Sequence, residues 1–231
     1  MLIPPNHSWI PGLVLADYIF GAWLLVAGTC IVFEIKARSI SLFLGAILLL
    51  VFCFYFIPYE FLATSDYLKL GEWDNAEKEL ALSGGAWVIA GGYSNENDSV
   101  ILRFISRLAP WGYVIFSITM ISFGIDHFLY AKAVSEYIPL WIPWKIFWAY
   151  VAGTALMGSG IGILLKIRIR LIAALLGTMI LIWFIILHIP KAIAAPSSDK
   201  GGEVTSAFLA LAYSGIAFVI AGGRKPKGLS K

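Results

Sequence analysis

The chain alternates between long apolar stretches and short polar connections. About 20 apolar residues are needed for a helix to cross the hydrocarbon core of a bilayer, and the pattern predicts seven such helices. They are expected at residues 12–33, 40–61, 75–92, 111–131, 144–165, 171–190 and 204–223. The third is the weakest, because only Leu80 to Gly92 is continuously apolar.

One apolar segment occurs twice. Shifted by 132, residues 9–58 fall on 141–190, and 17 of the 50 pairs are identical, including Trp-Ile-Pro at both starts and Ile-Pro at both ends. A shift of 131 then aligns SGGAWVIAGG at 83–92 with SGIAFVIAGG at 214–223, with eight of ten residues identical. Apolar composition does not produce matches through Trp, Pro, Gly and Arg in fixed register, so the pattern indicates an internal repeat.

The repeat predicts the organisation of the chain. Equivalent helices are four spans apart, so the repeats are expected to run in the same direction, related by an axis along the membrane normal. Two parallel three-helix repeats plus one extra helix are therefore predicted. The divisions are a partial repeat with three helices at 1–92, a cytoplasmic amphipathic linker at 93–110, a four-helix unit at 111–223 and a basic tail at 224–231.

Composition places the chain among all-α integral membrane proteins in contact with a lipid bilayer. Sixty per cent of its residues are hydrophobic and 13% are charged, against about 25% charged in soluble domains. Lys and Arg favour one set of connections by eleven to six, which predicts an outside N-terminus and a cytoplasmic C-terminus. The net charge of +3 mostly reflects this bias and does not indicate nucleic-acid binding.

Candidate cofactor ligands are sparse. The two cysteines, Cys30 and Cys53, form no CxxC motif, and no spacing resembles a haem, iron–sulfur or zinc ligand set. We therefore expect no metal site, and no cofactor is evident from the residues.

Ionisable residues inside predicted spans are the candidate site residues, because they are costly in a bilayer and usually face a bundle interior or a wet cavity. Nearly all of them are expected toward the outer face. The ligand-binding candidates are Asp17, Glu60, Lys78, Glu79, Asp126, His127 and His188, together with Trp144 from the aromatic outer connection. No catalytic residue is assigned.

Five of these residues leave alternatives open. Lys78 and Glu79 align with Leu209 and Ala210 of the second repeat; they either lie at headgroup level on a late-starting helix, form a structural ion pair, or face a ligand. Asp126 and His127 either cap an interfacial helix end or offer a proton-exchanging pair. His188 is structural, or joins them as one site at a similar depth.

The second half resembles the DoxX-like family of small four-helix membrane proteins. The resemblance is carried by GIDHFLYAKAV at 124–134, YIPLWIPW at 137–144, FWAYVAG at 147–153 and the last-helix motif LAYSGIAFVIAGG, repeated earlier as ALSGGAWVIAGG. It implies a helical bundle in the cytoplasmic membrane of a bacterium. Some members resemble subunits of quinone-linked oxidoreductases, and others accompany redox-defence or maturation systems. The duplication departs from the single-unit pattern.

Three functions follow as hypotheses. The first is a quinone-linked membrane redox component, or its accessory subunit, with an outward-facing site for a quinone or another lipophilic molecule and electrons supplied by a partner protein. The second is a small-solute transporter, a function that the repeats and the charged residues within the spans favour. The third is a non-catalytic assembly or interaction subunit, working with a partner protein or as a homo-oligomer.

Overall fold

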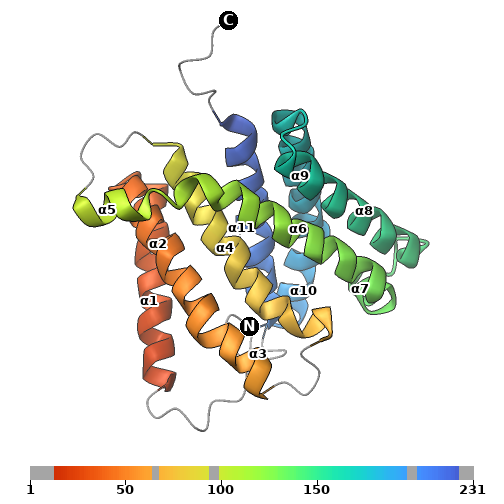
Figure 1. The fold of residues 1–231 in the computed structure, drawn as a ribbon. Coiled ribbons are helices and arrows are strands. Elements are labelled where there is room, and N and C mark those ends of the chain that lie inside the picture. The colour runs from red at the N-terminus through yellow and green to blue at the C-terminus, as the bar shows by residue number, and fades with distance from the viewer. Residues whose placement is uncertain (1–12, 64–67, 94–98, 197–201, 224–231) are drawn as a thin grey trace, which may run out of the picture.

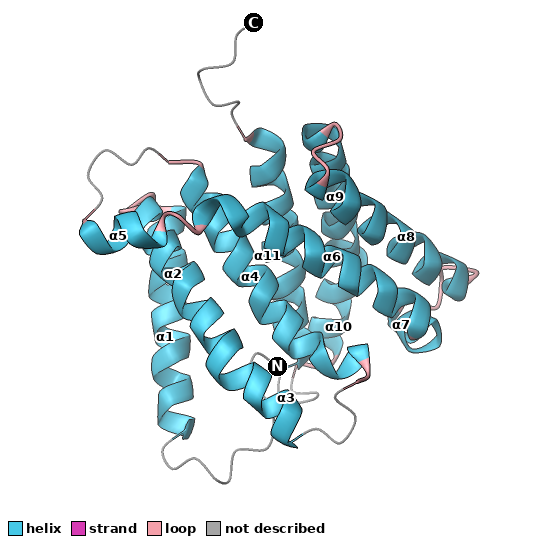
Figure 2. Ribbon diagram, in the orientation of Figure 1, coloured by secondary structure: helices cyan, strands magenta, loops and turns pink. Residues whose placement is uncertain are grey.

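The computed structural model describes residues 13–63, 68–93, 99–196 and 202–223, and within these ranges every regular element is a helix (Figure 2). The elements of the first half are α1 (Leu13–Val32), α2 (Ala37–Val51), the π-helix η1 (Phe52–Phe56), α3 (Ile57–Ala63), the 3-10 turn η2 (Leu70–Trp73) and α4 (Asp74–Gly91). Those of the second half are α5 (Val100–Ile105), the 3-10 turn η3 (Ala109–Trp111), α6 (Gly112–Leu129), α7 (Ala131–Tyr137), α8 (Lys145–Leu164), α9 (Ile169–Trp183), the π-helix η4 (Phe184–His188), α10 (Ile189–Ala194) and α11 (Gly202–Gly222).

Five of the long helices close into a ring. Along it, α4 packs against α6, α6 against α8, α8 against α9, α9 against α11, and α11 again against α4. Outside the ring, α2 packs on α4 and α1 packs on α2, so the N-terminal helices flank one side of the bundle (Figure 1). The principal buried cluster lies inside the ring and includes Phe116, Met120, Leu176 and Ala217.

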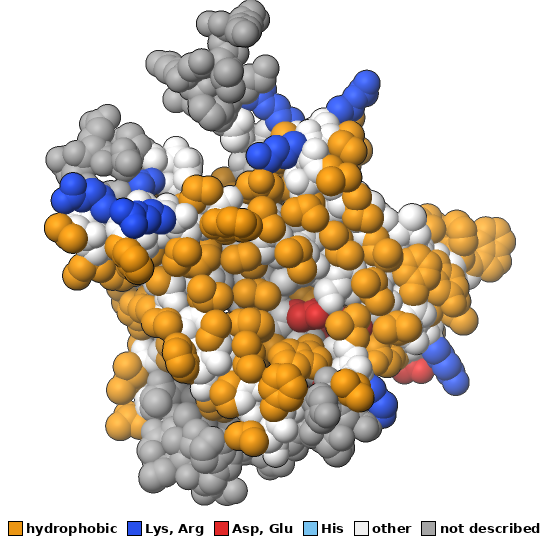
Figure 3. All heavy atoms as spheres, in the orientation of Figure 1, with side chains coloured by type: hydrophobic (Ala, Val, Ile, Leu, Met, Phe, Trp, Pro, Cys, Tyr) orange, Lys and Arg blue, Asp and Glu red, His pale blue; other side chains and the backbone are white. Residues whose placement is uncertain are grey.

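Within the described residues, five helical stretches are long and apolar enough to cross a membrane. They are Ala37–Leu62, Val100–Leu129, Lys145–Leu164, Ile169–Ala194 and Gly202–Gly222. Large hydrophobic side chains cover the side of the bundle that Figure 3 presents, and Lys and Arg gather at the end where α5 and the α8–α9 connection lie. This surface suits contact with lipid, as expected for a multi-pass membrane protein.

The expected helix at 75–92 forms although its sequence is less apolar than the other spans. α4 has α2, α6 and α11 as neighbours, and its glycines permit close approach. A Cβ built on Gly84 would lie 2.8 Å from the carbonyl oxygen of Gly112 on α6, and one built on Gly85 would collide with Ile216 on α11. Packing between helices therefore stabilises α4 where hydropathy alone is weak.

The backbone repeats its irregularities at positions 132 residues apart. Glu34 and Lys36 take positive φ angles of 58° and 48° in the α1–α2 turn, and Lys166 and Arg168 take 57° and 39° in the α8–α9 turn. Each following helix contains a five-residue π-helix, η1 or η4, that ends directly before an Ile-Pro pair.

Two contacts between helices also recur. The Ser83 hydroxyl donates to the Gly45 carbonyl at 2.7 Å, joining α4 to α2, and the Ser214 hydroxyl donates to the Gly177 carbonyl at 2.9 Å, joining α11 to α9. Two arginines bond to the ends of neighbouring helices. The Arg38 guanidinium donates to the Ala90 carbonyl in the last turn of α4, and the Arg170 guanidinium donates to the Gly223 carbonyl just after α11. Such bonds satisfy carbonyls that a helix end leaves without partners.

The expected amphipathic linker at 93–110 contains a short helix. α5 covers Val100–Ile105, and the Ser99 hydroxyl accepts a hydrogen bond from the Leu102 N–H at its start. Leu102 is the buried residue and packs near Leu42 and Trp87, whereas Ile101 and Phe104 are exposed. Leu102, together with the partly buried Ile105, therefore packs α5 against the cluster, while Ile101 and Phe104 face outward.

Candidate functional site

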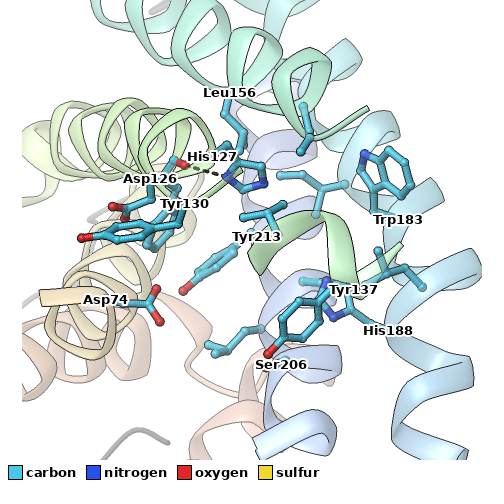
Figure 4. Close-up of a pocket in the computed structure, with 18 of the residues that line it drawn as sticks. Asp74, Asp126, His127, Tyr130, Tyr137, Leu156, Trp183, His188, Ser206 and Tyr213 are labelled. Atoms are coloured by element: carbon cyan, nitrogen blue, oxygen red, sulfur yellow. Dashed lines mark hydrogen bonds between the residues drawn. The ribbon is translucent and has the colours of Figure 1, made fainter. Parts of the chain in front are cut away.

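A cavity of about 640 Å³ lies within the helix ring, toward the end at which α4 begins and α6 finishes (Figure 4). Side chains from α4, α6, α7, α8, α9, η4 and α11 line it. Most of the wall is apolar or aromatic, as represented by Leu156, Met179, Trp148 and Trp183. The volume falls in the range of roughly 300–1,000 Å³ typical of small-molecule sites.

One part of the wall is polar. Asp74 of α4, Asp126 of α6 and Tyr213 of α11 lie near one another there (Figure 4), and Lys78 of α4 also lines the cavity. The Lys78 ammonium group forms an ion pair with the Asp74 carboxylate one turn earlier. The Tyr213 hydroxyl donates to the Lys78 backbone carbonyl at 3.3 Å, which fixes the tyrosine ring against α4. The Asp126 Oδ1 atom is buried and has no hydrogen-bond partner.

His127 is positioned by its own helix and by α8. Its Nδ1 atom lies 2.7 Å from the carbonyl oxygen of Phe123, one turn earlier on α6, and its ring lines the cavity. A Cβ added to Gly153 of α8 would come within 2.8 Å of the His127 Cβ atom. The missing side chain at Gly153 therefore allows α6 and α8 to approach closely enough to hold the imidazole in the cavity wall.

His188 enters the cavity wall from η4. Its Nδ1 atom is buried without a hydrogen-bond partner, and its ring lies beside Tyr137 of α7 (Figure 4). The Lys191 ammonium group sits 3.5 Å from the centroid of the Tyr137 ring and 4.0 Å from a carboxylate oxygen of Glu203. Lys191 thus links α7 to α11 near this wall of the cavity.

The segment after α6 forms another wall. Val134, Tyr137 and Ile138 line the cavity, and Ile138 and Ile142 pack with Leu187 of η4 in a separate small cluster. Tyr130 also contributes, and its hydroxyl accepts a hydrogen bond from the Gly71 N–H at 3.3 Å. The outer connection is thus packed against the bundle on both sides of the cavity.

The structure brings together four of the eight sequence-predicted candidates. Lys78, Asp126, His127 and His188 line the same cavity. Among the described residues, Glu60, Glu79 and Trp144 are not part of its wall: Glu60 is buried in α3, and Trp144 is 79% exposed just before α8. Asp17 lies in α1, and its side chain falls outside the described part of the chain.

Lys78 and Glu79 prove to have different surroundings. α4 begins at Asp74, so both residues lie in its second turn, and the helix does not start late. Lys78 pairs with Asp74 rather than with its neighbour. Glu79 is 0% exposed, and neither of its carboxyl oxygens has a hydrogen-bond partner. Lys78 is thus a cavity residue, and Glu79 is a separate buried polar group.

Several cavity residues were not predicted from the sequence. Tyr213, Trp183, Tyr137 and Asp74 all line the wall. Tyr213 aligns with Leu82 of the first repeat, and this difference between the copies was an available signal. Trp183 and Tyr137 are aromatic residues of a kind that is common in membrane helices and their connections, so their residue types alone do not indicate a site.

Within the described ranges, no group of three or more His, Cys, Asp or Glu side chains has a geometry suited to a metal ion. Comparison of the chain with protein-family models, with curated proteins and with solved structures finds no match. The functional interpretation therefore depends on the cavity and its residues.

Proposed function

We propose that this protein binds a lipophilic small molecule of quinone-like chemistry in the cavity of its helix ring, as a membrane redox component or the accessory subunit of one. The observation that carries the proposal is the combination of an apolar and aromatic cavity of about 640 Å³ with a polar wall formed by Asp126, His127 and Tyr213. Such a site accommodates a hydrophobic body and orients it through a few polar groups.

The surroundings of the cavity suit a ligand that arrives from the membrane. The bundle presents apolar side chains over the side seen in Figure 3, and five helices of the described part of the chain are long and apolar enough to cross a bilayer. A molecule that dissolves in lipid is apolar, and burial against the apolar walls of the cavity is therefore favourable for it. The quinone assignment itself follows from the resemblance to the DoxX-like family, and electrons would be supplied by a partner protein.

The same proposal includes the finer architecture. We infer seven membrane spans arranged as two parallel three-helix repeats plus α6, with the N-terminus outside and the C-terminus in the cytoplasm of a bacterium. The paired Ser–Gly bonds and the paired π-helices η1 and η4 support the duplication. The basic end of the bundle supports the orientation.

Filling the cavity tests the proposal. Ala152 of α8 is buried in the cavity wall, and Ala152→Phe is expected to weaken binding of the probe decylubiquinone at least tenfold, because the added ring occupies the ligand's volume. Binding is measured by calorimetric titration of the purified protein in lipid nanodiscs. Ala210→Phe, on the facing wall of α11, provides a second obstruction if the first variant folds poorly.

Val151→Phe is the matched control. Val151 is the neighbour of Ala152 on α8 but is 37% exposed, so a phenyl ring there points away from the cavity and should leave binding unchanged. Equal binding by the wild type and both cavity variants would refute the site. Absence of probe binding to the wild type, with a protein partner that co-purifies in stoichiometric amount, would favour a non-catalytic assembly subunit.

A further inference from the structure

The hydrogen bond of His127 determines which ring nitrogen carries a proton. Nδ1 lies 2.7 Å from the Phe123 carbonyl oxygen, and Figure 4 shows this bond directed away from the cavity and back along α6. A carbonyl oxygen can only accept a hydrogen bond. The Nδ1 atom must therefore be the donor, and the neutral ring exists as the Nδ1–H tautomer.

The other ring nitrogen is then an acceptor that faces the cavity. In the Nδ1–H tautomer, Nε2 carries a lone pair and no proton. The ring shares the wall with Leu156, Ala149 and Ala152, an apolar setting that disfavours the charged imidazolium. No hydrogen bond from a described residue to Nε2 occurs, so this acceptor is open to a ligand.

Nearby groups add further acceptors. The Tyr213 hydroxyl uses its single proton on the Lys78 carbonyl, which leaves its oxygen able to accept. The Asp126 Oδ1 atom is buried with no donor. The Lys78 ammonium group uses one of its three N–H donors on Asp74. At His127 itself, however, the ligand must supply the proton of the hydrogen bond, because Nε2 can only accept.

We propose that the ligand presents a hydroxyl group to His127 Nε2, so that the cavity selects a lipophilic alcohol or phenol, such as a quinol, over the corresponding carbonyl form. This inference rests on the proposed lipophilic ligand of the cavity. A quinone carbonyl facing Nε2 would place two acceptors together with no proton between them, whereas a quinol hydroxyl completes the hydrogen bond.

The cavity also gives the bound molecule a direction. His127, Asp126 and Tyr213 are polar residues of the cavity lining, whereas Met120, Met179 and Ile180 are apolar residues of it. The hydroxyl-bearing ring is placed against the polar wall, and its hydrocarbon chain against the apolar side chains.

The experiment compares three probes that share one hydrocarbon chain: decylubiquinol, decylubiquinone and the dimethyl ether of the quinol. Each is titrated under nitrogen into the full-length protein in nanodiscs, which keeps the quinol reduced. We expect the quinol to bind about tenfold more tightly than either other probe, the usual effect of one net hydrogen bond. In His127→Leu the preference for the quinol should fall at least about threefold, because one net hydrogen bond is lost, whereas Thr154→Val, on the exposed face of α8, should keep the full preference.

Each outcome has a distinct meaning. Equal binding of quinol and quinone to the wild type, or tighter binding of the quinone, overturns the hydroxyl assignment but leaves the cavity as a ligand site. A quinol preference that survives His127→Leu undiminished shows that His127 is not its source and overturns the inference. No binding of any probe to the wild type rejects the proposed function and this inference with it. Thermal unfolding of each variant establishes that the affinity changes do not arise from misfolding.

Discussion

Replacing Trp87 with alanine is expected to destabilise the protein by about 3–5 kcal/mol, the range for large-to-small changes of a buried aromatic side chain. Trp87 is 1% exposed and forms a cluster with Leu42, Ala90 and Leu102 that joins α4 to α2 and α5. Its Nε1–H also donates to the Leu42 carbonyl at 3.4 Å. Removing it would leave a void next to Gly45, which has no side chain to fill the space. Unfolding in mixed detergent micelles measures the loss.

The second repeat provides the control for this prediction. Phe218 aligns with Trp87 in the repeat, and it also packs against a glycine, Gly177. Phe218 is 38% exposed, so Phe218→Ala leaves a smaller void and should cost about 1 kcal/mol. Equal losses at the two positions would show that burial within the bundle does not determine the contribution of these aromatic residues.

Glu79→Leu is expected to have the opposite sign and to stabilise the protein by about 1–3 kcal/mol, the desolvation penalty of a buried polar group without a partner. The Glu79 side chain is 0% exposed and neither carboxyl oxygen is hydrogen-bonded. Leucine has a similar volume and no polar atoms, so it should occupy the site without that penalty. The measurement is the shift of the thermal midpoint in one detergent.

Two further variants separate burial from charge. Glu136→Leu removes a carboxyl group from the exposed surface of α7 and should change stability by no more than about 0.5 kcal/mol. Glu79→Gln retains a buried polar group and should gain less than Glu79→Leu. If Glu79→Leu instead lowers the midpoint, the carboxyl group makes a compensating interaction in the membrane-embedded protein, and Glu79 becomes a candidate functional residue.

The helical stretches could be predicted from hydropathy, and five of those described are long and apolar enough to cross a membrane. The stretch 75–92 was predicted through its sequence similarity to 204–223, because its own hydropathy is weak; α4 forms there with α2, α6 and α11 packed around it. The short α5 was harder to predict. Its helical spacing identifies an amphipathic element, but only the tertiary contact of Leu102 with α2 decides which residue is buried.

The candidate site could be predicted only in part. Lys78, Asp126, His127 and His188 were identified because ionisable groups in apolar helices are few, and all four line one cavity. Glu79 and Lys78 are both ionisable and adjacent in the sequence, so the sequence could not separate them. Adjacent residues of a helix point about 100° apart, and only Lys78 reaches the cavity. Tyr213 was missed because a tyrosine in an apolar helix becomes informative only when its hydroxyl is seen to reach α4.

The π-helices η1 and η4 change the helical phase within Ala37–Leu62 and Ile169–Ala194, two apolar stretches of 26 residues each. A π turn holds one residue more than an α turn, so the side chains beyond it are rotated by about 100° relative to an uninterrupted α-helix. A helical wheel drawn over Ile169–Ala194 would therefore place His188 on the wrong face. Because both repeats contain the extra residue, they align across it without a gap. Deleting one residue within η4 would rephase everything that follows it, turning Lys191 away from Tyr137 while leaving the membrane-spanning length almost unchanged.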